Sequence, residues 1–202
     1  MISEKFREVW PAIRGVEGWL PKADASFLYD AACAAERLDG VIVEIGAYKG
    51  RSAVTMGFAG SSDIYSVDPF KERTLQDGSI VPFNITDFAT NIKKAGLEGR
   101  VNPIVMTSKL ARDHWTRNVS KPIKLLFIDG DHSYEHVCED YELWNDLVID
   151  GGWIIFHDYE PGWPGVVKFV DELAAKLCNI EVVRFGACAG FQKRCEHAVQ
   201  AL

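Results

Sequence analysis

The sequence predicts an α/β fold in which a mainly parallel, doubly wound sheet is covered by helices on both faces. Short runs rich in β-branched residues end in polar residues, and stretches of helical length separate them. Because parallel strands need long crossovers, this alternation indicates a parallel sheet rather than a series of hairpins. The predicted strands are VIVEIG (41–46), DIYSVD (63–68), VNPIVM (101–106), IKLLFIDGD (123–131) and GGWIIFHD (151–158).

Hydrophobic periodicity predicts the helices between these strands. Apolar residues at spacings of three and four mark a helix over 134–148, and Pro164 is well placed to open another that runs to Leu177. Asp24 and Ser26 are predicted to cap a helix that ends near Ala35. The remaining predicted helices cover 51–59, 87–95 and 108–117.

Two features predict how the sheet ends. Pro103 cannot donate to a strand ladder, so the strand at 101–106 suits an edge position. The runs IEVVRF (180–185) and FQKR (191–194) are joined only by GACAG (186–190), which is too short for a crossover. These two runs are therefore predicted to form a C-terminal antiparallel hairpin, giving seven strands in all.

The chain is divided into an N-terminal helical or lid segment, 1–39, and a main domain, 40–202. Within the first segment, WPAIRGVEGWLPKAD (10–24) is rich in Trp, Gly and Pro. It could extend as a lid over the sheet edge or serve as a tether, and the sequence favours the tether.

Composition limits the classes of function. With 48% hydrophobic and 25% charged residues, the chain can bury one substantial core, and its net charge of −7 argues against nucleic-acid or anionic-membrane partners. No apolar run suits a membrane span or a secretory signal, so a cytoplasmic protein is expected. The cysteines form no CxxC pair and are predicted to be reduced and mostly buried: Cys33, Cys138, Cys178, Cys188 and Cys195.

A glycine loop and a following acid predict a ligand site. VEIGAYKGRSAV places Glu44, Gly46 and Gly50 around a strand-to-helix turn, where glycines allow close approach by a ligand. The spacing does not match the G-x-G-x-x-G dinucleotide pattern. Asp68 ends the next strand, where an acid can accept hydrogen bonds from both hydroxyls of a ribose. Asp68 could instead be a turn residue, and Glu44 a partner for nearby backbone groups.

VEIGAYKGRSAV, SVDPF, FIDGDHSYEHV and GGWIIFHDY together resemble the S-adenosylmethionine-dependent methyltransferases with a Rossmann-like fold. They are most similar to the small O-methyltransferase group that includes macrocin-type and catechol-type enzymes, and the similarity covers roughly 40–195. The resemblance implies that S-adenosylmethionine is the cofactor, with Asp68 at its ribose. It further implies that the methionine part contacts Glu44, Gly46, Ala47 and Gly50, with Ser52 beginning the helix beneath. Thr107 and Ser108 would lie near the adenine, or are ordinary helix-start residues.

Asp129 is predicted to emerge from a buried strand beside the glycine loop and hence beside the cofactor. A buried carboxylate needs a cation or hydrogen-bond donors, and His157 and Asp158 emerge from the neighbouring strand. Mg²⁺ prefers such oxygen ligands, so Asp129, Asp158 and His157 are candidate metal ligands, the two acids being favoured. The resemblance supports Asp129 as a ligand, but His157-Asp158 departs from the acidic or Asp-Asn pair of the relatives. Zn²⁺ or Fe²⁺ through His157 is an alternative.

The candidate catalytic residues are Asp129, His132 and Asp131. His132 lies beside two strand-end acids and could act as a general base on an acceptor hydroxyl, or be a surface histidine. Asp131 could be a helix cap, a supporting acid or a ligand, and Ser133 is expected to cap the helix that begins near Tyr134.

These features predict methyl transfer from S-adenosylmethionine to a hydroxyl of a small acceptor such as a sugar or a natural-product intermediate, with Mg²⁺ assisting. The alternatives are a nicotinamide-dependent oxidoreductase or epimerase, a non-catalytic cofactor-binding scaffold and a metal-dependent hydroxylase-like offshoot. A homodimer is one possible assembly, in which the N-terminal segment covers the partner's site. Covering its own site is the other arrangement.

Overall fold

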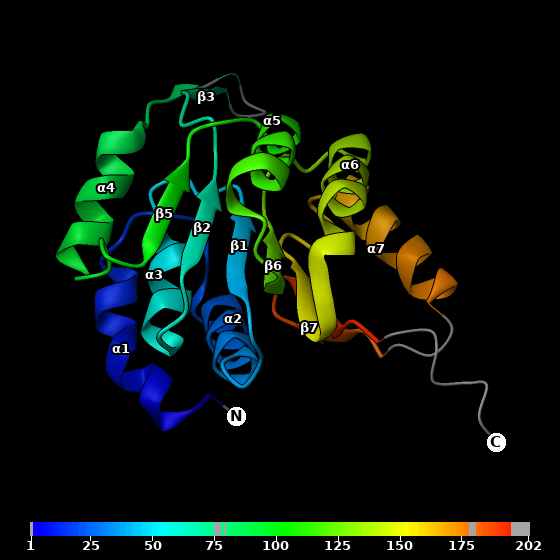
Figure 1. Cartoon of the computed structure of the whole chain (residues 1–202), viewed down its shortest axis with the longest axis horizontal. Coiled ribbons are helices and arrows are strands. Elements are labelled where there is room, and N and C mark those ends of the chain that lie inside the picture. Colours follow the sequence, from blue (N-terminus) through cyan, green and yellow to red (C-terminus); the bar gives the residue numbers. More distant parts are fainter. Residues whose placement is uncertain (1, 75–77, 79, 178–180, 195–202) are drawn as a thin grey trace.

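A seven-stranded sheet lies between two layers of helices in the computed structural model, which describes residues 2–74, 78, 80–177 and 181–194 (Figure 1). The sheet order is β5-β2-β1-β6-β7-β9-β8, and β9 and β8 form an antiparallel hairpin on the β7 side. The predicted α/β fold with a C-terminal hairpin is therefore confirmed. The strands are β1 (Val41–Ile45), β2 (Ile64–Val67), β5 (Val101–Ile104), β6 (Ile123–Ile128), β7 (Val148–Phe156), β8 (Val183–Phe185) and β9 (Cys188–Gln192), and a separate pair is formed by β3 (Arg73–Thr74) and β4 (Ile80–Val81).

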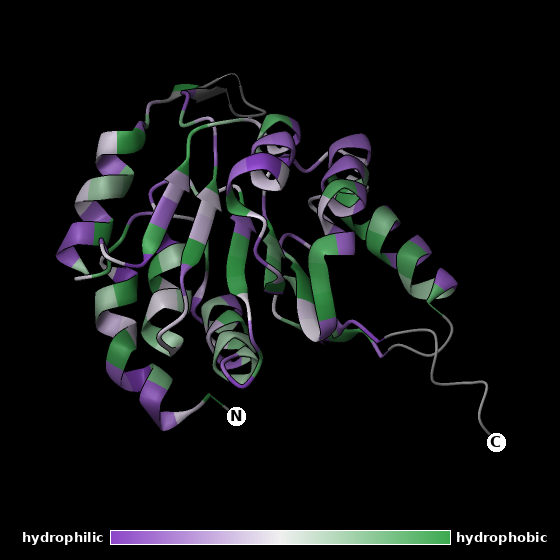
Figure 2. Ribbon diagram, viewed as in Figure 1, coloured by the Kyte–Doolittle hydropathy of each residue, from purple (hydrophilic) through white to green (hydrophobic). Residues whose placement is uncertain are grey.

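Alternating side chains of the central strands feed two hydrophobic cores, one on each face of the sheet. On β1, Ile42 enters one core while Val43 and Ile45 enter the other. The central strands β1 and β6 are accordingly mainly hydrophobic, with Glu44 in β1 and Lys124 in β6 as the charged exceptions (Figure 2). The first core is covered by α1 (Glu4–Arg14), α2 (Lys22–Ala35), α3 (Arg51–Ala59) and α4 (Ile85–Lys94), and the second by α5 (Ser108–His114), α6 (Tyr134–Trp144) and α7 (Pro164–Lys176).

Several predicted boundaries are wrong. The helix predicted over 134–148 ends at Trp144, and a short 3₁₀ turn leads directly into β7 at Val148. The helix from Ser108 is continued by a π-helical turn, Trp115–Val119. GACAG is not all turn, because Phe185 already pairs with Cys188. Gly186 has φ +62°, and this left-handed residue closes the hairpin in two residues.

The first part of the N-terminal segment differs from its prediction. WPAIR belongs to α1, which is capped by Ser3 and buries Phe6 and Ile13, so these residues are neither an extended lid nor a tether. Pro11 is accommodated inside that helix. The next helix begins at Lys22, so Asp24 is not a cap but lies buried within α2. Packing of the amphipathic α1 against α2 and α3 outweighs the local Pro and Gly signals here.

The described cysteines are free thiols of differing exposure. Cys188 is buried, Cys138 is half-buried and Cys33 is exposed, so the prediction of mostly buried thiols is wrong for Cys33. Cys178, Cys195 and the predicted strand residue Ile180 lie outside the described residues. Among the described helices, none has the length and apolar character needed to cross a membrane.

Candidate active site

The candidate site lies where the carboxyl ends of the parallel strands β1, β2, β6 and β7 meet at one edge of the sheet. From β1 the sheet continues through β2 to β5, and from β6 it continues to β7 in the opposite direction. The strand order therefore reverses between β1 and β6. Open α/β sheets bind ligands at such a point. The polar residues that follow each strand are therefore brought together, as the sequence predicts.

The glycine loop after β1 lies directly against the end of β6. Gly46 has φ +88° and Gly50 has φ +90°, a conformation that glycine adopts without strain. A Cβ at Gly46 would lie 2.0 Å from the carbonyl oxygen of Asp129. Only glycine fits this approach, which places the loop and Asp129 side by side.

Asp68 ties the glycine loop to the end of β2. Its Oδ2 accepts hydrogen bonds from the backbone N–H groups of Ala47, at 2.9 Å, and Tyr48, at 3.0 Å, and its Oδ1 accepts one from Phe70, at 2.6 Å. Asp68 thus stabilises the turn that follows β2, through Phe70, and also holds the glycine loop, through Ala47 and Tyr48. Carboxylate oxygens have further lone pairs, so these bonds leave room for ribose hydroxyls to donate.

Glu44, the fourth residue of β1, is completely buried beneath the glycine loop. Its partners are hydroxyls and not the backbone groups considered from the sequence: Ser52 Oγ donates to one oxygen at 2.6 Å and Ser66 Oγ to the other at 2.5 Å. Burial raises the pKa of Glu44 to about 7, and the two hydroxyls offset only part of this effect. Glu44 therefore titrates in the physiological range.

The connection between α1 and α2 lies over the glycine loop. Glu17 accepts hydrogen bonds from Tyr48 Oη at 3.0 Å and from Lys49 Nζ at 2.8 Å. Trp19 packs on the Tyr48 ring with centroids 4.7 Å apart. The N-terminal segment of the same chain thus covers this part of the site.

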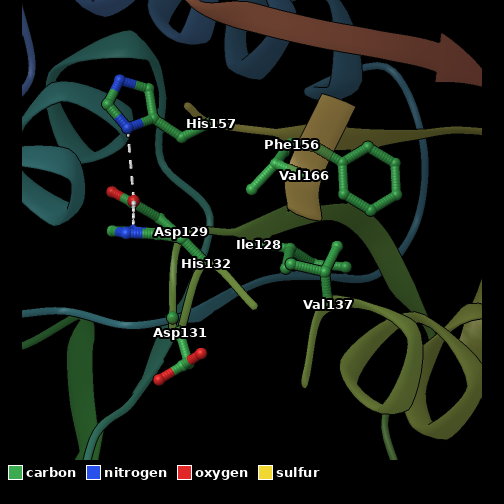
Figure 3. Close-up of a pocket in the computed structure, with 9 residues that line it drawn as sticks. Ile128, Asp129, Asp131, His132, Val137, Phe156, His157 and Val166 are labelled. Atoms are coloured by element: carbon green, nitrogen blue, oxygen red, sulfur yellow. Dashed lines mark hydrogen bonds and ion pairs between the residues drawn. The ribbon is translucent and has the colours of Figure 1, made fainter. Parts of the chain in front are cut away.

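Asp129, at the end of β6, lies between His157 and His132 (Figure 3). A second acid, Asp158, contacts both histidines. Asp129 Oδ1 lies 3.2 Å from His157 Nδ1 and 3.9 Å from His132 Nε2. Asp158 Oδ2 lies 3.3 Å from His157 Nδ1 and 2.9 Å from His132 Nε2, the latter an ion-pair distance without good hydrogen-bond alignment. Asp158 reaches this position with φ +58°, a strained conformation for a residue with a Cβ.

The charges in this group stabilise one another. Burial alone would raise the pKa of Asp129, but the positive charge and hydrogen bond of His157, together with the nearby His132, lower it instead. Burial likewise opposes the charge on His132, yet the two carboxylates raise its pKa to about 9. The pKa of His157 is raised well above its usual value by Asp129 and its other acidic neighbours. Both histidines therefore carry a proton at neutral pH.

The donor atoms that a metal could share differ from those predicted. Asp129, His132 and Asp158 each offer an atom within 4.8 Å of the other two. His157 has carboxylates at both ring nitrogens, with Nε2 3.1 Å from Asp24 Oδ2, so it is engaged as a donor. His132 thus takes the place of His157 in the set that suits a divalent ion.

The other predicted site residues lie outside the acid and histidine group. Asp131 points away from it in Figure 3 and accepts a hydrogen bond from the Ser133 N–H at 2.8 Å, at the start of α6. Ser133 is the N-cap residue of α6, but its hydroxyl lies 2.7 Å from the His136 side chain, at Nδ1, and makes no hydrogen bond to a backbone N–H of the helix. Thr107 is the N-cap residue of α5 but makes no side-chain cap hydrogen bond, and Ser108 Oγ accepts a hydrogen bond from Trp144 Nε1 at 3.0 Å.

Sequence reasoning missed three residues that shape the site. Asp24 contacts His157 from α2, Ser66 holds Glu44 from β2, and Trp163 lies on the His132 ring with centroids 4.0 Å apart. The only signal for Asp24 was its position directly before the apolar helical stretch ASFLYDAACAA, which local sequence interprets as a helix cap. Ser66 and Trp163 carry no comparable local signal.

Comparisons with known proteins agree with this geometry. The family described as "Methyltransferase domain" matches residues 43–159. An uncharacterized protein of Acanthamoeba polyphaga mimivirus is 31% identical over 150 residues, which cover 70% of this chain and 62% of that protein. The chain therefore spans less than two thirds of that relative's length.

Solved O-methyltransferases have a similar fold at low identity. NovP has a TM-score of 0.70 and 17% identity, covering 85% of this chain and 79% of its own. TomG from Streptomyces achromogenes, solved with S-adenosylmethionine, has a TM-score of 0.64 and 15% identity, and the match covers 96% of this chain and 91% of TomG. CalS11, a TDP-rhamnose 3′-O-methyltransferase, has a TM-score of 0.62 and 16% identity, and the match covers 94% of this chain and 93% of CalS11. The matched stretch runs from β1 to the end of the β7 loop and contains the whole strand-end site, so this chain belongs to the methyltransferase domain family.

Proposed function

We propose that the protein transfers a methyl group from S-adenosylmethionine to a hydroxyl of a small acceptor. The observation that carries this proposal is the contact between the glycine loop and Asp129, with a Gly46 Cβ position only 2.0 Å from the Asp129 carbonyl oxygen. A cofactor on the loop would thereby present its methyl group next to a group of acids and histidines. That is the arrangement in which a nucleophilic oxygen can be aligned with a sulfonium.

The cofactor would lie along the ends of β1 and β2. In this proposal the methionine part contacts Glu44, Gly46, Ala47 and Gly50, and Asp68 accepts hydrogen bonds from the ribose hydroxyls. Ser52 acts through its bond to Glu44. The exposed Thr107 is proposed near the adenine, whereas Ser108 is engaged by Trp144 and contributes mainly as the first residue of α5.

Methyl transfer forms a carbon–oxygen bond as the carbon–sulfur bond breaks, and the sulfonium becomes a neutral sulfide. The acceptor hydroxyl loses its proton in the process. Asp129 is the proposed proton acceptor, because His157 and His132 keep it ionised. His132 carries a proton at neutral pH, so it serves the base role expected from the sequence only after losing that proton.

A divalent cation fits the donor set of Asp129, Asp158 and His132, whose atoms lie within 4.8 Å of one another. Two carboxylate oxygens and one imidazole nitrogen suit Mg²⁺ or Mn²⁺ with waters completing the shell, and a softer transition ion more strongly. When bound, such an ion would lower the pKa of a coordinated hydroxyl. His157 would then orient the carboxylates through Nδ1.

The acceptor is proposed to be a hydroxylated sugar or a natural-product intermediate. The similarity in fold to the TDP-rhamnose 3′-O-methyltransferase CalS11 supports this class. Trp163 contacts His132 and Trp19 contacts Tyr48, and aromatic side chains suit the apolar faces of sugars and ring systems.

Calorimetric titration tests the cofactor. S-adenosylmethionine is expected to bind at one site per chain, while NADH gives no heat of binding. A screen of hydroxylated acceptors by mass spectrometry should then detect a gain of one methyl group. Binding of NADH in place of S-adenosylmethionine would eliminate the proposal in favour of an oxidoreductase, and cofactor binding without methyl transfer to any acceptor would favour a scaffold.

Removal of divalent cations tests the metal. We expect EDTA to lower turnover at least about ten-fold and added Mg²⁺ or Mn²⁺ to restore it, because the ion would acidify and position the hydroxyl. The assay is initial-rate methyl transfer after dialysis, with Ca²⁺ and Zn²⁺ compared at the same concentration. Full activity in chelator would rule out metal assistance and leave the histidine-stabilised Asp129 as the working group.

A further inference from the structure

His157 is held on both sides by carboxylates from different parts of the chain. The residue is 4% exposed, and its Nδ1 lies 3.2 Å from Asp129 while its Nε2 lies 3.1 Å from Asp24. An imidazole with an acceptor at each nitrogen cannot rotate or flip without losing a hydrogen bond. The ring orientation at the Asp129 side is therefore set from the Asp24 side.

Asp24 is built into the protein core. It is 1% exposed in α2, and its second oxygen accepts a hydrogen bond from the backbone N–H of Ala187 at 3.0 Å, in the β8–β9 turn. A Cβ at Gly186 would lie 1.8 Å from that same oxygen, so the turn closes tightly on the carboxylate. A buried carboxylate is costly unless fully partnered, and Asp24 has one donor for each oxygen.

We propose that Asp24 is a positioning residue for methyl transfer, which acts through His157 to hold Asp129 in its reactive orientation. This inference rests on the proposed function and assigns a role to a residue outside the matched 43–159 stretch. Asp24 does not touch the acceptor side itself. It fixes the imidazole, and the imidazole fixes the carboxylate that meets the hydroxyl.

Cys188 makes a competing arrangement possible. Its Sγ, an oxygen of Asp24 and a nitrogen of His157 lie within 4.8 Å of one another, all three residues being buried. A metal held there would occupy His157 Nε2 and remove the hydrogen bond on which the inference depends. We expect no such ion, because both acidic partners already satisfy the ring, and elemental analysis of the purified protein decides between the two arrangements.

The test compares Asp24→Asn with Asp30→Asn on the same helix. The Asn amide keeps the shape of Asp24 and can still accept from Ala187, but it presents no negative oxygen to His157. We expect kcat to fall about 10- to 100-fold, as is typical when a supporting hydrogen bond is removed, while KM and the dissociation constant for S-adenosylmethionine change less than about two-fold. Asp30 is exposed, so its variant should keep the wild-type kcat.

Two further measurements separate positioning from folding. In wild-type protein, NMR should show a slowly exchanging, low-field N–H signal from His157 Nε2, and Asp24→Asn should lose it. In a His157→Gln background, Asp24→Asn should cost little additional kcat, because the effect passes through the ring. Absence of that signal in wild type, a kcat within two-fold of wild type in Asp24→Asn, or full additivity with His157→Gln would each overturn the inference.

The proposed function can fail separately from this inference. If wild-type protein methylates no acceptor, the proposed function is wrong, and the NMR signal still tests the contact between Asp24 and His157. A stoichiometric zinc ion that is lost in Cys188→Ser would also overturn the positioning role.

Discussion

Asp129→Ala is expected to lower kcat for methyl transfer at least about 1000-fold, the largest catalytic effect of any single substitution in the site. The change removes the proposed proton acceptor and also the carboxylate shared by His157 and His132. Two positive rings would then face an apolar gap in place of an acid. Initial rates measured by mass spectrometry, at saturating cofactor and acceptor, give the effect on kcat.

The matched control is Asp113→Ala, which removes an acid from the exposed surface of α5, where its ion-pair partner is Arg117 at 3.9 Å. It should retain the wild-type rate. Asp129→Asn separates charge from shape, because the amide still accepts a hydrogen bond but cannot take the proton, and it should be nearly as inactive as the alanine variant. A rate near wild type in either Asp129 variant would mean that the reacting group lies elsewhere.

Glu44→Gln is expected to stabilise the ligand-free protein at pH 8 by on the order of 2–3 kcal/mol and to change its stability little at pH 4.5. Burial raises the folded-state pKa of Glu44 from 4.5 to about 7. A group with a raised pKa contributes its full stability below pH 4.5 and loses it as the pH rises to about 7. Glutamine stays neutral throughout, so the advantage of the variant grows over that range.

Thermal unfolding measured from pH 4.5 to 8.5 checks this prediction. For a chain of this size, 2–3 kcal/mol corresponds to roughly 5–10 °C in melting temperature. Glu98→Gln, an exposed control, should follow the wild-type curve. Equal melting temperatures for Glu44→Gln and wild type at pH 8 would show that Ser52 and Ser66 keep Glu44 ionised without cost. If the carboxylate also meets the cofactor's ammonium group, the stabilised variant should bind S-adenosylmethionine more weakly.

The fold could be predicted because its signals are local. Each parallel strand carries its own β-branched run, and Pro103 and the short link before Phe191 identify the edge strand and the hairpin without reference to distant residues. Boundaries were less accurate where tertiary packing decides them. The strand β7 begins at Val148 because it pairs with Ile123, which no local pattern reveals.

The candidate site divides in the same way. Strand ends predicted that Asp129, His157 and Asp158 converge, since parallel strands deliver their carboxyl ends to one edge. The choice between His132 and His157 as a metal donor depends on which ring is already engaged, and that follows from Asp24, far away in sequence. Local sequence makes Asp24 look like a helix cap, whereas its depth in the core makes it a partner of His157.

The bonds of Asp24 span the chain: they reach His157 across 133 positions and Ala187 across 163. Contacts of such separation form late, because the intervening loop must close first. During synthesis, a nascent chain that extends only as far as β7 still lacks the β8–β9 turn, whose Ala187 N–H donates a hydrogen bond to Asp24. The contacts that orient His157 are therefore completed only after Ala187 has left the ribosome, and chains that stop before the β8–β9 turn lack them.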